Sequence, residues 1–220
     1  MKKPLHHSVR SKIPAPDPRR IIGDLGKHGS GPLAVFVGGI HGNEPAGVAA
    51  LEQIVAELGG IEDRLLGRVV AIRGNVAALS EGKRFLDEDL NRLWTKSTIQ
   101  RIRHKPVLLE EERELLDLLG VFESIIKEHQ GPVYFFDLHT TSGKSPPFMT
   151  INDVLINRKF AAQIPVPIIL GIEEFLDGPM LSYVNDLGYV ALGFEGGQHT
   201  DAQSIGRCKA FSYLAIVLAG

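Results

Sequence analysis

The sequence predicts an α/β fold in which a mixed, mainly parallel central sheet carries helices on both faces. Two observations support this prediction. Apolar runs of strand length alternate along the chain with longer segments whose apolar residues recur at helical spacing, as in strands joined by crossover helices. The strand-like runs are also rich in valine, isoleucine and phenylalanine, which indicates a sheet that is buried on both sides.

Bulk composition excludes several other classes of protein. A chain of 220 residues is long enough to bury a full core, and 44% hydrophobic and 23% charged residues are ordinary values for a globular domain. The formal net charge is only -2, so the chain has no basic excess for nucleic acid or for an anionic membrane. We therefore expect a small molecule as the partner, and a homo-oligomer is compatible with this composition.

Cysteine content and apolar runs favour a cytoplasmic protein. Cys208 is the only cysteine, so the chain has neither an intrachain disulfide nor a cysteine zinc cluster. No apolar run approaches the roughly 18 residues that cross a bilayer. The first residues also lack the apolar core of a secretory signal peptide.

Residues 1–20 are expected to form an extended N-terminal segment ahead of a single catalytic domain over 21–220. Basic residues and four prolines make a helix unfavourable in that segment. Residues 23–32 read as a glycine-rich approach to the first core strand, which is predicted at 33–39. A helix over about 45–58 should follow, because proline is tolerated in a first helical turn and the apolar residues have helical spacing.

The middle of the chain contributes one strand, a polar loop and a long helix. The strand is predicted at 67–73, with a short segment at 76–79 after it. Residues 84–94 are unusually polar with large apolar residues interleaved, and we expect an irregular loop there. A helix over about 108–128 should follow, with leucines on one face and acidic residues on the other.

The second half of the chain continues the alternation of strands and helices. Strands are predicted at 133–139, 148–151, 166–170 and 188–195. Helices are predicted at 158–164, 178–187 and 202–218.

Chemically useful side chains gather where three of these strands end. His41 and Glu44 follow the first strand and are three positions apart, so they can converge on one side of a helix start. His139 ends one later strand and Glu195 ends another. Asp137 should point the same way as His139, since residues two apart on a strand share a face. Strand ends are where α/β sheets bind ligands.

Two imidazoles and one carboxylate are the ligand set of a hydrolytic zinc site with a fourth position for water. His41, Glu44 and His139 are therefore candidate ligands for one Zn²⁺ per chain. Such an ion lowers the pKa of its water towards about 7 and polarises a carbonyl. Glu195 is not needed as a ligand, so it is free to act as the general base.

Each of these signals is weak when taken alone. A single histidine at a strand end is more often a hydrogen-bonded structural residue, and a histidine and glutamate three apart recur by chance. The charged run over 84–92 would ordinarily be a solvated loop, in which the acidic residues 87–89 neutralise the arginines. The joint placement after separate strands favours the metal site. Of the other histidines, the following are expected at the surface or in structural roles, although the last one could line the cleft: His28, His104, His129 and His199.

Four segments together resemble the signatures of the succinylglutamate desuccinylase and aspartoacylase family, a branch of the zinc carboxypeptidase superfamily. They occur in the family's order, at residues 38–44, 84–92, 137–142 and 194–197. The resemblance implies a zinc carboxypeptidase-like fold. It also implies zinc-dependent hydrolysis of the amide bond of an N-acyl amino acid by a metal-activated water. Members commonly continue into a smaller β-rich domain, which this sequence lacks, so we expect either a compact variant or a shortened chain.

The resemblance also implies a role for each matching residue. Glu195 would be the catalytic glutamate that moves a proton from the attacking water to the leaving amine. Arg84 would polarise the scissile carbonyl and stabilise the oxyanion. Asn91 and Arg92 would bind the carboxylate of the substrate. Asp89 would orient a metal-binding histidine from behind, and Asp137 could do the same from its own strand.

Two other functions are compatible with the same residues. A carboxypeptidase that removes the last residue of a short peptide needs the same metal, base and carboxylate clamp. A catalytically silent zinc-binding module would keep the fold and the ligands. Neither Glu195 nor Arg84 is required merely to retain a metal, so their presence favours the enzyme.

Overall fold

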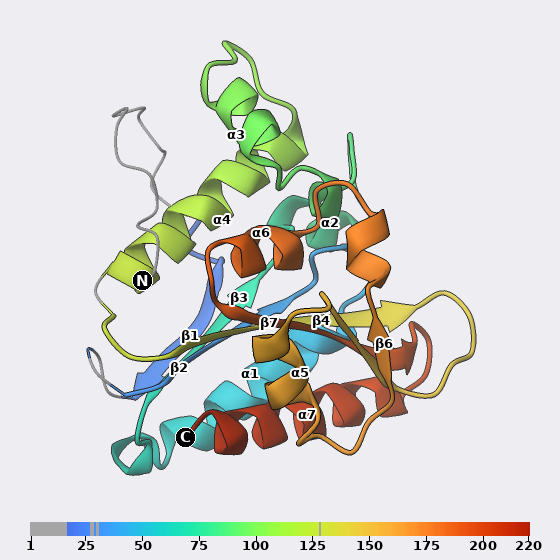
Figure 1. The fold of residues 1–220 in the computed structure, drawn as a ribbon. Helices are drawn as coiled ribbons and strands as arrows, with labels where there is room; N and C mark the ends of the chain where they lie inside the picture. Colours follow the sequence, from blue (N-terminus) through green and yellow to red (C-terminus); the bar gives the residue numbers. More distant parts are fainter. Residues whose placement is uncertain (1–16, 27–28, 30, 128) are drawn as a thin grey trace.

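A seven-stranded sheet lies between two layers of helices in the computed structural model of the chain, which describes residues 17–26, 29, 31–127 and 129–220 (Figure 1). The strand order is β1-β3-β2-β4-β7-β5-β6. The bounds are β1 Ile21–Gly26, β2 Leu33–Gly38, β3 Arg68–Arg73, β4 Val133–Thr141, β5 Phe148–Ile151, β6 Ile168–Leu170 and β7 Val190–Gln198.

The centre of the sheet is parallel and its edges are antiparallel. Strands β3, β2, β4 and β7 pair in parallel, in that order. At one edge β1 runs antiparallel to β3, and at the other β5 runs antiparallel to β7 and carries β6 in parallel. The predicted fold class, a mixed and mainly parallel sheet with helices on both faces, is confirmed.

Alternate residues of the central strands build two separate cores. In β2, Leu33, Val35 and Val37 belong to one buried cluster, whereas Ala34 and Phe36 belong to the other, as the two-residue period of a strand requires. The first core is covered by α3 Lys96–Arg103, α4 Glu110–Lys127 and α6 Met180–Asp186. The second core is covered by α1 Ala46–Gly59, α5 Leu155–Ala161 and α7 Gln203–Ala219 (Figure 1).

Shorter elements complete the connections. They are helix α2 Val76–Glu81 and the 3-10 turns Glu62–Arg64, Leu90–Arg92 and Ile172–Phe175. The turn Leu90–Arg92 is the one regular element inside the polar loop predicted over 84–94. Among the described residues, every helix is either too short or too polar to cross a bilayer.

Most predicted elements are found within a few residues of their expected bounds, and three predictions need correction. The helix expected at 158–164 begins and ends three residues earlier, as α5. The prediction of a glycine-rich approach over 23–32 is partly wrong, because residues 23–26 belong to strand β1, which begins before that segment and ends at Gly26. Helix α3 has no counterpart among the predicted elements.

The extended segment predicted for 1–20 falls mainly on residues 1–16, which lie outside the described residues. The described remainder forms a turn that is tied to α4. Arg20 is only 1% exposed and forms ion pairs with Glu114 and Asp117. The chain therefore enters the core before β1 begins.

Glycine lets the end of β2 pass very close to the start of α1. A Cβ atom on Gly38 would lie 2.8 Å from the carbonyl carbon of Gly47 and 2.8 Å from the backbone nitrogen of Val48. Both neighbours are backbone atoms, so they cannot move aside as a flexible side chain could. This close approach fixes where the chain turns out of the sheet towards His41 and Glu44.

We predict that Gly38→Ala destabilises the fold by about 1–3 kcal/mol, the usual cost of overpacking. Gly59→Ala is the matched control, because a Cβ there meets nothing within 4 Å among the described residues and should be neutral or stabilising by about 0.4–1 kcal/mol. Denaturant unfolding followed by circular dichroism measures both values. Equal midpoints for Gly38→Ala and the unsubstituted protein would contradict the close packing.

Candidate metal centre

The candidate centre lies at the carboxyl ends of β2, β4 and β7. Strands β3 and β4 flank β2 on opposite sides, so the chain adds its next strand on one side of β2 and the following one on the other side. Such a change of direction opens a ligand-binding crevice at the strand ends. His41 and Glu44 follow β2, His139 lies in β4, and Glu195 lies in β7 directly opposite His139 in the register. The structure thus brings together the four residues that the sequence placed after separate strands.

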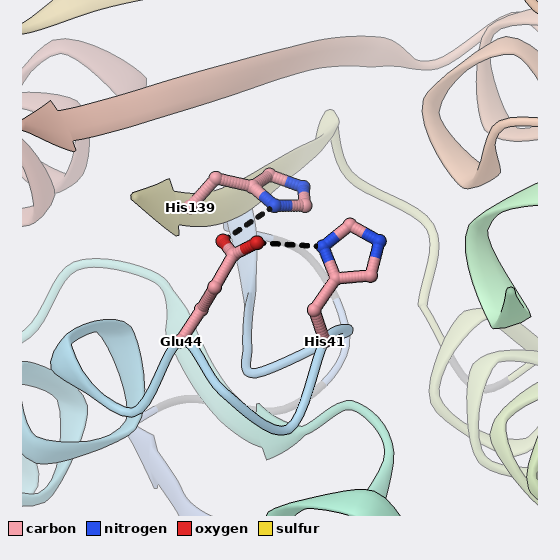
Figure 2. A group of neighbouring side chains, drawn as sticks. All are labelled: His41, Glu44 and His139. Carbon is pink, nitrogen blue, oxygen red and sulfur yellow. Dashed lines mark hydrogen bonds and ion pairs between the residues drawn. The ribbon is translucent and has the colours of Figure 1, made fainter. Parts of the chain in front are cut away.

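Glu44 is the point at which the two histidines meet (Figure 2). Its Oε1 lies 2.8 Å from Nδ1 of His41, and its Oε2 lies 3.1 Å from Nδ1 of His139. One ligand atom from each of the three residues lies within 4.8 Å of the others. His41 and Glu44 are 4% and 3% exposed, and the backbone N–H of Thr140 also donates to Glu44 Oε2. The geometry is a compact set of three candidate ligands with little access to bulk water.

A second layer of carboxylates faces the outer nitrogen of each ring. Nε2 of His41 lies 3.2 Å from Asp89 Oδ1, and Nε2 of His139 lies 2.8 Å from Asp137 Oδ2. A carboxylate oxygen accepts a hydrogen bond from an N–H group, so these contacts favour N–H at Nε2 and direct the Nδ1 lone pairs inward. The structure therefore places Asp89 and Asp137 where the predicted orienting residues should be.

The carboxylates around these two imidazole rings favour the binding of a cation. Burial alone would lower the pKa of His139, but Asp137 and Glu44 outweigh burial and raise that pKa well above its ordinary value. Burial would raise the pKa of Glu44, but hydrogen bonds from His139 and His41 hold it well below its usual range. Three carboxylates thus surround two imidazoles, and a divalent ion can supply the positive charge that protons otherwise provide.

Glu195 adds an acidic side chain without a partner beside this cluster. Its Oε2 is buried and has no hydrogen-bond partner among the described residues. Burial raises the pKa of Glu195 to about 7, with His139 opposing the rise and Glu44 contributing to it. A buried oxygen without a partner among the described residues is suited to contact a bound molecule or ion that is not part of the chain. Together with the inward-facing Nδ1 atoms, it makes the donor set suitable for zinc and its water.

Arg84 reaches the same cluster from the polar loop. Its Nη2 donates to Asp89 Oδ2 at 3.1 Å, and its Nη1 lies 3.5 Å from Glu44 Oε1. The side chain of Arg84 remains 42% exposed. The guanidinium therefore contacts the carboxylates of the cluster while part of the side chain remains open to solvent.

Asn91 and Arg92 follow Asp89 in the turn Leu90–Arg92, and their polar groups are partly engaged within the chain. Asn91 is 8% exposed, and its Oδ1 accepts from the backbone N–H of Met180 at 2.8 Å. Any contact of this side chain with a substrate would thus use its amide nitrogen. Arg92 donates from Nη1 to the carbonyl of Asn91 at 2.7 Å. The substrate-binding roles of both residues stay predictions.

Two contributing residues were not singled out by the sequence. Thr140 supplies the backbone N–H to Glu44, and its Oγ1 lies 2.7 Å from Nδ1 of His199. Its place within the segment 137–142, directly after His139, is the signal that could have indicated it. Glu111 accepts hydrogen bonds from the polar loop, although its place in an acidic run suggested a solvated face.

Comparison with known proteins identifies a matching family. Residues 30–174 match the succinylglutamate desuccinylase/aspartoacylase catalytic domain. A succinylglutamate desuccinylase of Pseudomonas paraeruginosa is 29% identical over 116 residues, which are 53% of this chain and 33% of that protein. One from Yersinia pseudotuberculosis is 32% identical over 106 residues, which are 48% of this chain and 31% of that protein. The matched stretches span about a third of these two relatives.

Solved structures share the fold at low sequence identity. The succinylglutamate desuccinylase of Chromobacterium violaceum superposes with a TM-score of 0.68 at 17% identity and covers 88% of this chain and 64% of that chain. The product-bound ectoine utilization protein of Ruegeria pomeroyi gives a TM-score of 0.67 at 21% identity, with 88% and 59% covered. At these identities the likeness establishes the fold.

We predict that the purified protein binds one Zn²⁺ at pH 7.5 and that His139→Ala abolishes this binding. Loss of a ligand should cost more than the roughly 10–100-fold that loss of an outer partner costs. The affinity should also fall as the pH is lowered, because the raised pKa of His139 lets protons compete for Nδ1. Calorimetric titration at pH 7.5 and 5.5, with elemental analysis, measures both effects.

His104→Ala is the control for this prediction, since His104 is exposed and its imidazole hydrogen-bonds to the carbonyl of Gln100. It should bind zinc as the unsubstituted protein does. Equal binding by His139→Ala, or affinity that rises in acid, would contradict the assignment.

Proposed function

This chain belongs to the succinylglutamate desuccinylase and aspartoacylase family, and on that basis we propose that it hydrolyses the amide bond of a small N-acyl amino acid with the help of zinc. The main support is the arrangement of the two imidazoles. Each turns Nδ1 to the shared Glu44 and Nε2 to an outer carboxylate. An acidic oxygen without a partner, Glu195 Oε2, lies beside them.

In this proposal His41, Glu44 and His139 hold the ion, and Asp89 and Asp137 keep the rings in the binding tautomer. Bound zinc would supply a nucleophile at neutral pH and polarise the acyl carbonyl. Burial of Glu44 keeps bulk water from competing with these contacts. The two relatives are named as succinylglutamate desuccinylases, and this supports deacylation of an acyl amino acid as the proposed reaction. The acyl group for this chain is also part of the proposal.

Glu195 is proposed as the group that moves the proton. It takes a proton from the attacking water and returns it to the nitrogen of the leaving amine. A pKa of about 7 suits both steps, because proton transfer is most effective when the pKa of the group lies near the working pH. Its place opposite His139 in the register supports a role beside the proposed ligands.

The arginines are proposed to handle the negative charges of the substrate. Arg84, which is partly exposed and already pairs with Asp89, would stabilise the oxygen that becomes negative when the carbonyl is attacked. Arg92 would bind the free carboxylate through its planar guanidinium, aided by the amide nitrogen of Asn91. The one-domain organisation over 21–220 and a cytoplasmic location complete the proposal.

We predict that the zinc-loaded protein releases free amino acid from N-succinyl and N-acetyl amino acids faster than it cleaves matched dipeptides. Glu195→Gln should lower kcat by about 10²–10⁴-fold, the usual contribution of a general base, and should keep its zinc because the side chain lies outside the ligand set. Amine release and elemental analysis on the same samples test both statements.

Two variants serve as controls for this experiment. Glu52→Gln, at an exposed glutamate paired with Arg73, should keep both zinc and activity, whereas His139→Ala should lose both. Preferred cleavage of dipeptides would favour a carboxypeptidase. Hydrolysis of no member of either panel would favour a silent zinc-binding module, and zinc loss in Glu195→Gln would mean that this glutamate is a ligand.

A further inference from the structure

A buried glutamate in α4 holds the backbone of the loop that carries Arg84 and Asp89. Glu111 is 0% exposed, although it lies in the first turn of α4 and within a run of three glutamates. It does not contact the metal ligands. A fully buried carboxylate is costly unless hydrogen bonds compensate for lost water.

Four hydrogen bonds provide this compensation, and three of them come from consecutive loop amides. Oε1 of Glu111 accepts from the backbone N–H of Leu86 at 2.7 Å. Oε2 accepts from the N–H of Asp87 at 2.9 Å and from that of Glu88 at 3.2 Å. The fourth donor is Asn75 Nδ2, at 3.1 Å from Oε1. The carboxylate therefore fills a nest of backbone amides, which is a geometry that binds anions.

The charge of Glu111 is preserved by the same contacts. Burial acts to raise the pKa of Glu111, but the hydrogen bonds from the loop amides and Asn75 outweigh it and hold the pKa below its ordinary value. The side chain is consequently an anion at neutral pH, and it accepts at both oxygens.

The held segment sits between two residues of the metal centre. Arg84 lies two positions before Leu86, and Asp89 directly follows Glu88. Asp89 in turn contacts His41 Nε2 and Arg84 Nη2. A shift of the loop amides would therefore move both the guanidinium and the carboxylate that orients His41.

The far side of the loop has anchors of its own. Asn91 Oδ1 accepts from the N–H of Met180 at 2.8 Å, and the N–H of Trp94 donates to the carbonyl of Gly178 at 3.0 Å. These bonds hold the segment that carries Arg92 independently of Glu111. Loss of Glu111 should thus disturb Arg84 more than Arg92.

We propose that Glu111 is a positioning residue, which fixes the 86–88 backbone and through it the placement of Arg84 and Asp89 for the reaction. The proposal rests on the proposed function for its effect on rate. Its effect on loop order does not depend on any activity.

Glu111→Gln tests this inference, because the amide keeps the shape of the side chain but turns an N–H₂ group towards backbone N–H donors. We expect faster hydrogen exchange at the amides of 86–88 and a kcat lowered by about 10–100-fold, as small misplacements of catalytic groups produce. KM should change less than threefold, and bound zinc should be retained at saturating metal.

Glu112→Gln is the matched control. Glu112 is also 0% exposed and lies next to Glu111 in α4, but it accepts from Lys105 and from the N–H of Leu109 rather than from the amides of 86–88. This variant should leave exchange at 86–88 and kcat close to those of the unsubstituted protein. A loss of kcat equal to that of Glu111→Gln would assign Glu111 only to the stability of α4 and overturn the proposal.

A double-mutant cycle separates positioning from a general loss of folding. If Glu111 acts by placing Arg84, then Glu111→Gln should cost at most about threefold in kcat when Arg84 is already alanine. Undiminished cost in that background, or unchanged exchange at 86–88, would overturn the proposal. Should the unsubstituted protein hydrolyse nothing, the proposed function fails, while the exchange data still decide whether Glu111 holds the loop.

Discussion

Two imidazole nitrogens converge on one buried carboxylate, and the rest of the site depends on that convergence. Nδ1 of His41 and Nδ1 of His139 lie 2.8 and 3.1 Å from the two oxygens of Glu44. Without a cation, such proximity holds only if protons or arginine neutralise the surrounding carboxylates. The same three groups are the usual ligands of a zinc ion that keeps a position open. A zinc ion would thus supply positive charge that balances these carboxylates.

The fold creates this convergence by placing β2 and β4 side by side and in parallel. Residues that leave the ends of both strands then meet at one edge of the sheet, and the close approach of Gly38 to α1 sets the direction in which the chain leaves β2. Helix α4, which covers the face of the sheet opposite to α1, also supports the site. Its Glu111 holds the loop amides, while Glu114 accepts from the first amides of α2. The buried Glu111 and the partly buried Glu114 thereby connect one helix to the polar loop and to the start of α2.

The central strands and most helices could be predicted from the sequence because their apolar residues have the period of the structure that they form. Strand β1 could not, since it contains glycines and only pairs with β3 over a long sequence separation. Helix α3 was missed because only Ile99 and Ile102 of it are buried, although its N-cap Thr95 is a local signal. The candidate metal ligands were proposed from motif spacing and strand ends, and the fold brings their side chains together. Glu111 could not be predicted, because nothing local distinguishes a buried glutamate from the solvated ones that surround it.

Anomalous diffraction at the zinc absorption edge, measured on crystals of the zinc-loaded protein, tests the central claim most directly. The account predicts one zinc ion bound by Nδ1 of His41, Nδ1 of His139 and the carboxylate of Glu44. Both Nε2 atoms should still face Asp89 and Asp137, and Glu195 should lie outside the ligand set. Zinc located away from these three residues, or bound through Nε2 of either ring, would contradict it.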